Sequence, residues 1–189
     1  RYLGHFSSII VVGRELHIKN QGLVKSSKEK VKFRLIKEYN SPLDDFLNSK
    51  IIDKHILDSV KKVDAVIVRL PSILGFRAIN LCKKINKPYA IEVVGCGWDS
   101  YWYYGNLKGK LMAFISYNRM KKLVKHSKFT IYVTQSYLQK RYKTIGYNSY
   151  ASNVEIDNNI DLVLDNHKKN IIDNKKTIFG MLGNIDVYY

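Results

Sequence analysis

The sequence predicts an α/β protein with a Rossmann-like parallel sheet and helices on both faces. Apolar segments of strand length alternate along the chain with amphipathic segments of helix length, which is the order of a parallel sheet joined by crossover helices. The strand-like segments are mostly continuous apolar runs, as expected of strands that are covered on both sides. With 189 residues, 46% of them hydrophobic, the chain is long enough to bury a core.

The predicted elements follow one another in a regular order. Residues 6–14 and 30–39 are expected to form the first two strands. Residues 41–62 are expected to form a helix or two abutting helices, because Ser41 suits the N-cap and Pro42 suits the first helical position. The remaining strands are predicted at 64–70, 88–95, 129–134 and 150–156, and the remaining helices at 72–86, 109–127 and 135–143. Ser72 is a candidate N-cap for the helix at 72–86.

The composition changes near the C-terminus of the sequence. Residues 1–156 hold all the elements above and are expected to form one Rossmann-like domain. Residues 157–176 are rich in Asn, Asp and Lys and indicate a linker. Residues 177–189 begin with another apolar run. We expect this run to be the first strand of a second, truncated domain.

The net charge of +16 is concentrated in one region of the sequence. Between residues 100 and 154 there is no Asp or Glu, but there are ten Lys and Arg residues. A positive field of this kind attracts phosphate, in nucleic acid, in an anionic lipid surface or in a phosphorylated substrate. The charge alone does not choose among these partners.

Several other classes of protein are disfavoured by the composition. No apolar run is long enough to cross a bilayer, and the first residues do not resemble a signal peptide. The two cysteines, Cys82 and Cys96, form no CxxC motif, and the five histidines are scattered. We therefore expect a protein of a reducing cytoplasm with no structural metal.

A glycine turn follows the strand predicted at 88–95 and leads into a cluster of aromatic residues. Gly95 and Gly97 nearly match a dinucleotide fingerprint, but Ser100 stands at its last glycine position, and Trp98 and Asp99 add bulk and negative charge where a pyrophosphate would lie. Open α/β sheets bind ligands at the carboxyl ends of their strands. A turn with indole, phenol and carboxylate groups at this place favours a carbohydrate ligand.

The residues of this turn have structural explanations as well. Asp99 can cap a helix. The aromatic side chains can pack a small core under the loop, and they are Trp98, Tyr101, Trp102, Tyr103 and Tyr104. Glu92 lies inside an apolar strand, where a carboxylate needs a partner. Arg69 ends the preceding predicted strand at the same edge, so an Arg69–Glu92 ion pair is expected, with either a structural or a catalytic role.

The helix predicted at 109–127 is amphipathic and strongly basic. Its cationic side includes Arg119, Lys122 and Lys125, and the apolar residues Phe114 and Ile115 project on the same side. Apolar side chains framed by lysines are typical of a helix that lies on anionic lipid. A solvated face and nucleic-acid binding are the alternatives, although the sequence has no nucleic-acid recognition motif.

Several segments together resemble one family of enzymes. The sequences "RYLGHFSSIIVVGR", "DAVIVRLPSILG", "KPYAIEVVGCGWD", "GNLKGKLMA", "YVTQSYLQKRY" and "SNVEI" are similar to the N-terminal domain of bacterial two-domain (GT-B) glycosyltransferases of family 4, found in capsule and surface-polysaccharide pathways. The segment "IFGMLGNID" resembles the start of their donor-binding domain. The resemblance implies a GT-B half that is incomplete at both ends. Members usually have a proline where this chain has Cys96-Gly97, which predicts a looser turn.

The resemblance implies transfer of a sugar from a nucleotide-sugar to a saccharide acceptor, with retention of configuration and without metal or other cofactor. The acceptor it implies is linked to polyprenyl pyrophosphate. Asp99 or Glu92 would serve catalysis, since the histidine usual in the family is absent from the matching strand. Gly183 would belong to the donor site. The implied acceptor-binding residues are Arg69, Gly95, Gly97, Trp98, Tyr101 and Trp102.

The basic helix would dock this enzyme on the inner face of the plasma membrane, through Phe114, Ile115, Arg119, Lys122 and Lys125. Nucleic acid is not an expected partner of such an enzyme. The main alternative is a non-enzymatic basic module that binds nucleic acid or another anionic polymer. Epimerisation of a nucleotide-sugar on the same architecture is a third possibility, which the aromatic loop and basic helix disfavour.

Overall fold

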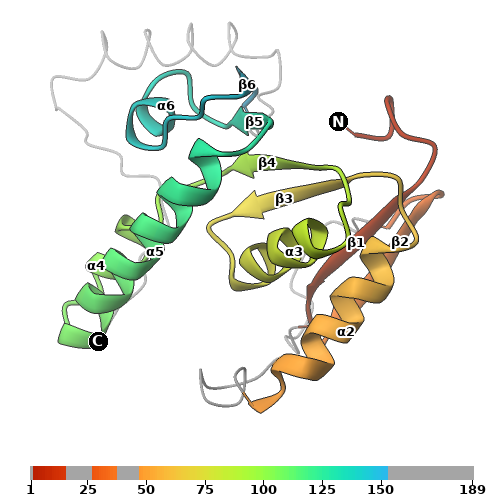
Figure 1. Cartoon of the computed structure of the whole chain (residues 1–189), viewed down its shortest axis with the longest axis horizontal. Helices are drawn as coiled ribbons and strands as arrows, with labels where there is room; N and C mark the ends of the chain where they lie inside the picture. The colour runs from red at the N-terminus through yellow and green to blue at the C-terminus, as the bar shows by residue number, and fades with distance from the viewer. Residues whose placement is uncertain (1, 16–26, 38–46, 153–189) are drawn as a thin grey trace, which may run out of the picture.

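The computed structural model describes residues 2–15, 27–37 and 47–152 (Figure 1). From the second strand to the sixth, one or two helices separate successive strands, and all described strand pairs are parallel. This confirms the Rossmann-like α/β fold class. The strands are β1 (Ile9–Arg14), β2 (Val31–Ile36), β3 (Val66–Leu70), β4 (Tyr89–Val93), β5 (Phe129–Tyr132) and β6 (Tyr147–Tyr150). The helices are α2 (Ser49–Val60), α3 (Ile73–Lys84), α4 (Asp99–Trp102), α5 (Leu107–Lys125) and α6 (Tyr137–Arg141).

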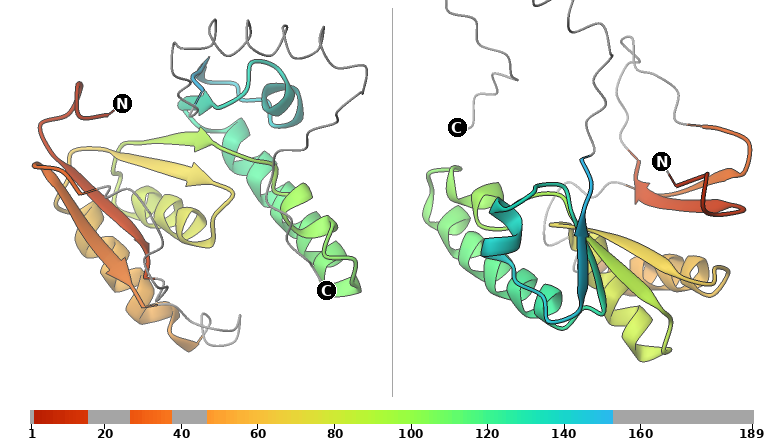
Figure 2. Two further views of the ribbon diagram at one scale, coloured as in Figure 1. Left: turned by 180° about the vertical axis from the view of Figure 1, so that it is seen from behind. Right: turned by 90° about the horizontal axis from the view of Figure 1, so that it is seen from above.

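The described strands form two sheets rather than one continuous sheet. Strands β1 and β2 pair with each other, and the second sheet has the order β3-β4-β5-β6. The right-hand view in Figure 2, from above, shows the β1–β2 pair apart from the twisted sheet of the other four strands. Helix α2 joins the two sheets in sequence and packs against β1, β2 and α3. Its buried residues Ile52, Ile56 and Val60 form a core with Ile36 of β2 and Cys82 of α3.

The larger core lies on one side of the four-stranded sheet. Val68 is in register with Ile91, and Leu70 with Val93, so all four side chains project to the same side. They pack against α3 and α5 in a single cluster of buried residues, which also includes Phe76, Ile79, Met120, Leu123 and Val124. These two helices therefore cover the same face of the sheet.

The intervening residues of the strands project to the other side of the sheet. Ile67 and Arg69 of β3 are exposed there, although the β3 segment is continuously apolar apart from Arg69. Glu92, in register with Arg69, is buried on this side. Burial in β3 thus alternates, which differs from the uniform burial that its sequence suggests.

Side-chain hydrogen bonds cap the N-termini of α3 and α5. The side chain of Ser72 accepts a hydrogen bond from the backbone N–H of Gly75 at 3.2 Å, which confirms the predicted cap of α3. Helix α5 begins at Leu107, two residues before the predicted start, because the Asn106 side chain accepts from the N–H of Gly109 at 2.6 Å. The last described strand is β6 rather than a strand at 150–156, of which residues 153–156 lie outside the described residues.

Candidate functional site

The carboxyl ends of β3, β4 and β5 meet at one edge of the sheet. The backbone N–H of Val94 donates to the carbonyl of Leu70 at 2.8 Å, and that of Val133 donates to Val93 at 3.1 Å. The pairing of the three strands thus continues to their ends. The glycine turn with α4 leaves from β4 at this edge, and the segment that forms α6 leaves from β5. Ligands of open α/β sheets bind at such an edge.

Asp99 is held at this edge by two residues of α6. The Tyr137 hydroxyl donates a hydrogen bond to Asp99 Oδ2 at 3.0 Å, and Arg141 Nη2 lies 3.6 Å from Asp99 Oδ1. The Arg141 guanidinium also lies over the rings of Tyr117 and Tyr137, at 5.6 and 5.9 Å from their centroids. We call Asp99, Tyr137 and Arg141 the carboxylate cluster. It joins α4 to α6 and rests on Tyr117 of α5.

The electrostatics of the carboxylate cluster keep the Tyr137 phenol protonated. The pKa of Tyr137 is raised, first by the hydrogen bond to Asp99, with smaller contributions from burial and from the Asp99 charge. A protonated phenol donates a hydrogen bond to the carboxylate at neutral pH. Tyr137 and Arg141 therefore orient both oxygens of Asp99.

The glycine turn is fixed by close contacts on two sides. A Cβ atom on Gly97 would lie 2.8 Å from Ser116 Oγ and 3.3 Å from Met120 Sδ, so only glycine lets the turn approach α5 this closely. The backbone N–H of Gly97 donates to the Tyr142 hydroxyl at 2.9 Å, and Cys96 Sγ lies 3.3 Å from the same oxygen. These contacts join the turn to α5 and to Tyr142. The looser turn expected from Cys96-Gly97 stays a prediction.

The other glycine of the turn has a different environment. A Cβ on Gly95 would meet its nearest neighbour, Pro71 Cδ, at an ordinary 3.5 Å. Packing at this position therefore does not demand glycine. Gly95 and Gly97 were both predicted to bind an acceptor, and that role remains a prediction. The structure gives Gly97 a packing role as well.

The aromatic residues of the loop divide into a packed and an exposed group. Trp98 stacks on Trp102 with ring centroids 4.6 Å apart and meets Tyr117 edge-on at 6.0 Å. Trp98 also packs against the large core, so its ring has a packing role, and its predicted acceptor contact stays a prediction. Trp102, Tyr103 and Tyr104 remain exposed, Tyr103 to 74%.

Tyr101 faces Tyr104, with 6.3 Å between the ring centroids, and is partly buried. Of the predicted acceptor-binding rings, Trp102 is thus the most accessible. Tyr103 and Tyr104, which were not among the predicted site residues, extend its surface. We call Trp102, Tyr103 and Tyr104 the aromatic surface.

Arg69 and Glu92 form the ion pair that the sequence predicts. Arg69 Nε lies 3.1 Å from Glu92 Oε2, and the two residues are in register on adjacent strands. Glu92 is 2% exposed, whereas most of the Arg69 side chain is in solvent. The arrangement stabilises a carboxylate inside the sheet, which is a structural role for both residues. Their predicted parts in catalysis and acceptor binding stay predictions.

Helix α5 presents an exposed face that is apolar in its first half and basic in its second. Phe114 is 59% exposed and Ile115 is also exposed, and Lys122 and Lys125 are exposed further along. Leu107 and Leu111, which the sequence analysis missed, extend the apolar part, and Leu107 is 83% exposed. Their spacing of four residues was the available signal. No helix in the described ranges is long and apolar enough to span a membrane.

Arg119 differs from the other predicted docking residues. Its guanidinium lies over the ring of Phe76 in α3, 4.5 Å from the centroid. It therefore turns toward α3 and away from the exposed face that carries Phe114 and Lys125.

The remaining predictions concern metal and donor binding. The described part of the chain contains no group of three or more His, Cys, Asp or Glu side chains that could hold a metal ion. Gly183 lies outside the described residues. The residues of the candidate site that sequence reasoning missed are Tyr137, Arg141 and Tyr142 of the α6 region. Tyr137 and Arg141 are four residues apart, and this spacing on a helix after a strand end was the available signal.

Comparison with known proteins gives one informative relationship. No family model matches the chain, and no solved structure matches it. The chain is 36% identical to protein CapJ of Staphylococcus aureus over 191 residues, which cover all of this chain and 47% of CapJ. The chain is thus a homologue of CapJ and spans about half the length of that curated relative.

Proposed function

We propose that this chain is the acceptor-binding half of a glycosyltransferase of surface-polysaccharide biosynthesis. The enzyme would transfer a sugar from a nucleotide-sugar to a saccharide acceptor with retention of configuration. The observation that carries the proposal is the position of the carboxylate cluster beside the aromatic surface, at the carboxyl edge of a parallel sheet. The sequence resemblance to family 4 GT-B enzymes and the similarity to CapJ support it.

The aromatic surface would hold the acceptor sugar. Exposed indole and phenol rings stack on the apolar faces of sugar rings, and their polar atoms hydrogen-bond to hydroxyl groups. The Trp102 ring stacks on Trp98, and the ammonium group of Lys110 lies 5.5 Å from the centroid of the Trp102 ring. A ring held in this way loses little freedom when it binds a ligand.

Asp99 would receive the attacking hydroxyl of the acceptor. A carboxylate has about four acceptor positions, and Tyr137 and Arg141 approach one oxygen each. Further acceptor positions remain for a sugar hydroxyl. In this arrangement Asp99 positions the hydroxyl or accepts its proton, and Tyr137 and Arg141 act as positioning residues.

The acceptor would be lipid-linked, which would place the enzyme on the inner face of the plasma membrane. The exposed apolar residues Leu107, Leu111, Phe114 and Ile115 are followed on α5 by Lys122 and Lys125. This pattern suits a helix that lies in the interface of an anionic membrane. The nucleotide-sugar donor would bind mainly through a second domain, of which Gly183 is the predicted contact.

The proposal is tested by Asp99→Asn in the full-length protein. We expect the transfer of label from nucleotide-sugars to a lipid-extractable product to fall by about 100-fold, the scale of a lost general acid–base contribution. Asp64→Asn is the matched control, because Asp64 is exposed and lies before β3, at the opposite end of the strand from the proposed site. Unchanged turnover in Asp99→Asn would remove Asp99 from catalysis. Salt-sensitive binding of single-stranded oligonucleotide without any sugar transfer would favour the alternative of a basic binding module.

A further inference from the structure

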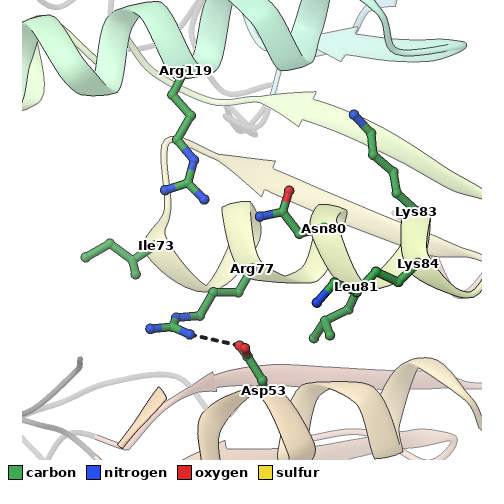
Figure 3. Close-up of a pocket in the computed structure, with 8 residues that line it drawn as sticks. All are labelled: Asp53, Ile73, Arg77, Asn80, Leu81, Lys83, Lys84 and Arg119. Atoms are coloured by element: carbon green, nitrogen blue, oxygen red, sulfur yellow. Dashed lines mark hydrogen bonds and ion pairs between the residues drawn. The ribbon is translucent and has the colours of Figure 1, made fainter. Parts of the chain in front are cut away.

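A groove of about 500 Å³ lies between α2, α3 and α5. Figure 3 shows Arg119 reaching into it from α5, Asp53 facing it from α2, and the side chains of α3 between them. None of the residues of the carboxylate cluster or the aromatic surface lines it. The described residues around the groove are Asp53, Ile73, Arg77, Asn80, Leu81, Lys83, Lys84 and Arg119.

The lining of the groove is strongly cationic. Among its described lining residues, four are basic and one, Asp53, is acidic. Arg77 Nη1 donates to Asp53 Oδ1 at 2.9 Å, so the single carboxylate is already engaged. The charges of Arg119, Lys83 and Lys84 are not balanced by any acidic side chain of this lining.

Arg119 is held in the groove by packing. Its guanidinium covers the face of Phe76 at 4.5 Å from the ring centroid, an arrangement typical of stacked arginines. The pKa of Arg119 is lowered, mainly by burial and then by the charge of Arg77. Two guanidinium groups of like charge thus act on each other across the groove. An anion between them would relieve this repulsion.

We infer that the groove is a binding site for a phosphate group. Guanidinium groups match the geometry of phosphate oxygens in paired hydrogen bonds, and lysine ammonium groups add charge. The Asn80 amide, which also lines the groove from α3, can donate further hydrogen bonds. The volume suits a small phosphorylated molecule or a lipid headgroup. The inference does not rest on the proposed sugar transfer, because it uses none of those residues.

Two experiments on the full-length protein distinguish the sources of the phosphate. Calorimetric titration with inorganic pyrophosphate tests a soluble ligand. Cosedimentation with vesicles of phosphatidylglycerol and phosphatidylcholine, compared with phosphatidylcholine alone, tests a lipid headgroup. We expect binding in at least one of these assays.

The decisive variant is Arg119→Gln, which removes a charge while the Arg77–Asp53 pair is kept. We expect binding to weaken by about tenfold, the loss of one charge-assisted interaction, and Arg119→Lys to lose less. Lys140→Gln is the control with the same change of charge, since Lys140 is exposed on α6 and is not part of the groove. Thermal unfolding of each variant checks that the fold is retained.

Each outcome has a defined meaning. If Arg119→Gln weakens pyrophosphate binding and Lys140→Gln does not, the groove is a site for a soluble phosphate compound. If Arg119→Gln weakens only the binding to anionic vesicles, the groove is a site for a lipid headgroup. Absence of binding in both assays, or equal losses in Arg119→Gln and Lys140→Gln, would overturn the inference, because the groove would then be no more than part of a general positive field.

Discussion

The hydroxyl of Tyr142 accepts a hydrogen bond from the backbone N–H of Gly97 at 2.9 Å, although 45 residues separate the two in sequence. The Tyr142 carbonyl in turn accepts from the Tyr132 hydroxyl at 2.6 Å. Tyr142 is fully buried. One tyrosine after α6 thus connects the glycine turn to β5 and fixes the position from which Trp98 and Asp99 emerge.

The first prediction concerns this hydrogen bond. Tyr142→Phe removes the acceptor of the Gly97 N–H and leaves a buried donor unsatisfied. We expect the free energy of unfolding, measured by urea denaturation, to fall by about 1–3 kcal/mol. Tyr147→Phe serves as the control, because Tyr147 is exposed in β6. Equal stability of the two variants would mean that the Tyr142 hydroxyl does not secure the turn.

The second prediction separates the two glycines of the turn. Gly97→Ala places a Cβ 2.8 Å from Ser116 Oγ, whereas Gly95→Ala makes only an ordinary contact with Pro71. We expect Gly97→Ala to lower the free energy of unfolding by about 1–3 kcal/mol, as for overpacked sites, and Gly95→Ala to change it little. Adding Ser116→Ala to Gly97→Ala should restore part of the loss. Failure of this rescue would point to a cause other than the contact with Ser116.

The third prediction concerns the ion pair between β3 and β4. Arg69→Met removes the cation that compensates the buried carboxylate of Glu92. Because Arg69 is largely exposed, solvent screens part of the effect, and we expect a loss of about 1–3 kcal/mol in chemical denaturation. The double variant Arg69→Met/Glu92→Met should be more stable than Arg69→Met alone. A double variant that is less stable than either single one would show that Glu92 stabilises the sheet through other contacts.

The fourth prediction tests membrane docking by α5. Phe114→Asp combined with Lys122→Glu places negative charge on its exposed face, and we expect the affinity for phosphatidylglycerol vesicles to fall at least about tenfold. The control is Ile145→Asp with Lys143→Glu, which makes the same change of charge at exposed residues outside α5. Vesicle binding that survives in the α5 variant would exclude this face as the docking surface.

Local patterns in the sequence were enough to predict much of the fold. The apolar segments around Val68 and Ile91 marked β3 and β4, and Ser72 marked the start of α3. Strand β6 was placed too late in the sequence because Tyr147–Tyr150 is exposed and half polar, so its strand structure comes from pairing with β5. The sequence of one segment does not show which distant strand it will pair with.

The candidate site was only half predictable for a related reason. Asp99 and Trp102 stood out because unusual residues follow a strand end. Tyr137 meets Asp99 across 38 residues of sequence, and only the fold brings them together. The pair Arg69–Glu92 was predictable, since adjacent parallel strands in register place two such residues side by side.

The anchoring of the glycine turn through Tyr142 has a consequence for engineering this protein. Through Tyr142 and Arg141, the C-terminal end of α6 holds both the turn and the carboxylate of Asp99. A displacement of α6 would therefore disturb its contacts with the loop. If the aromatic loop holds the acceptor as proposed, libraries designed to change ligand preference should randomise α6 together with the loop, because substitutions in α6 would shift the groups proposed to contact the ligand.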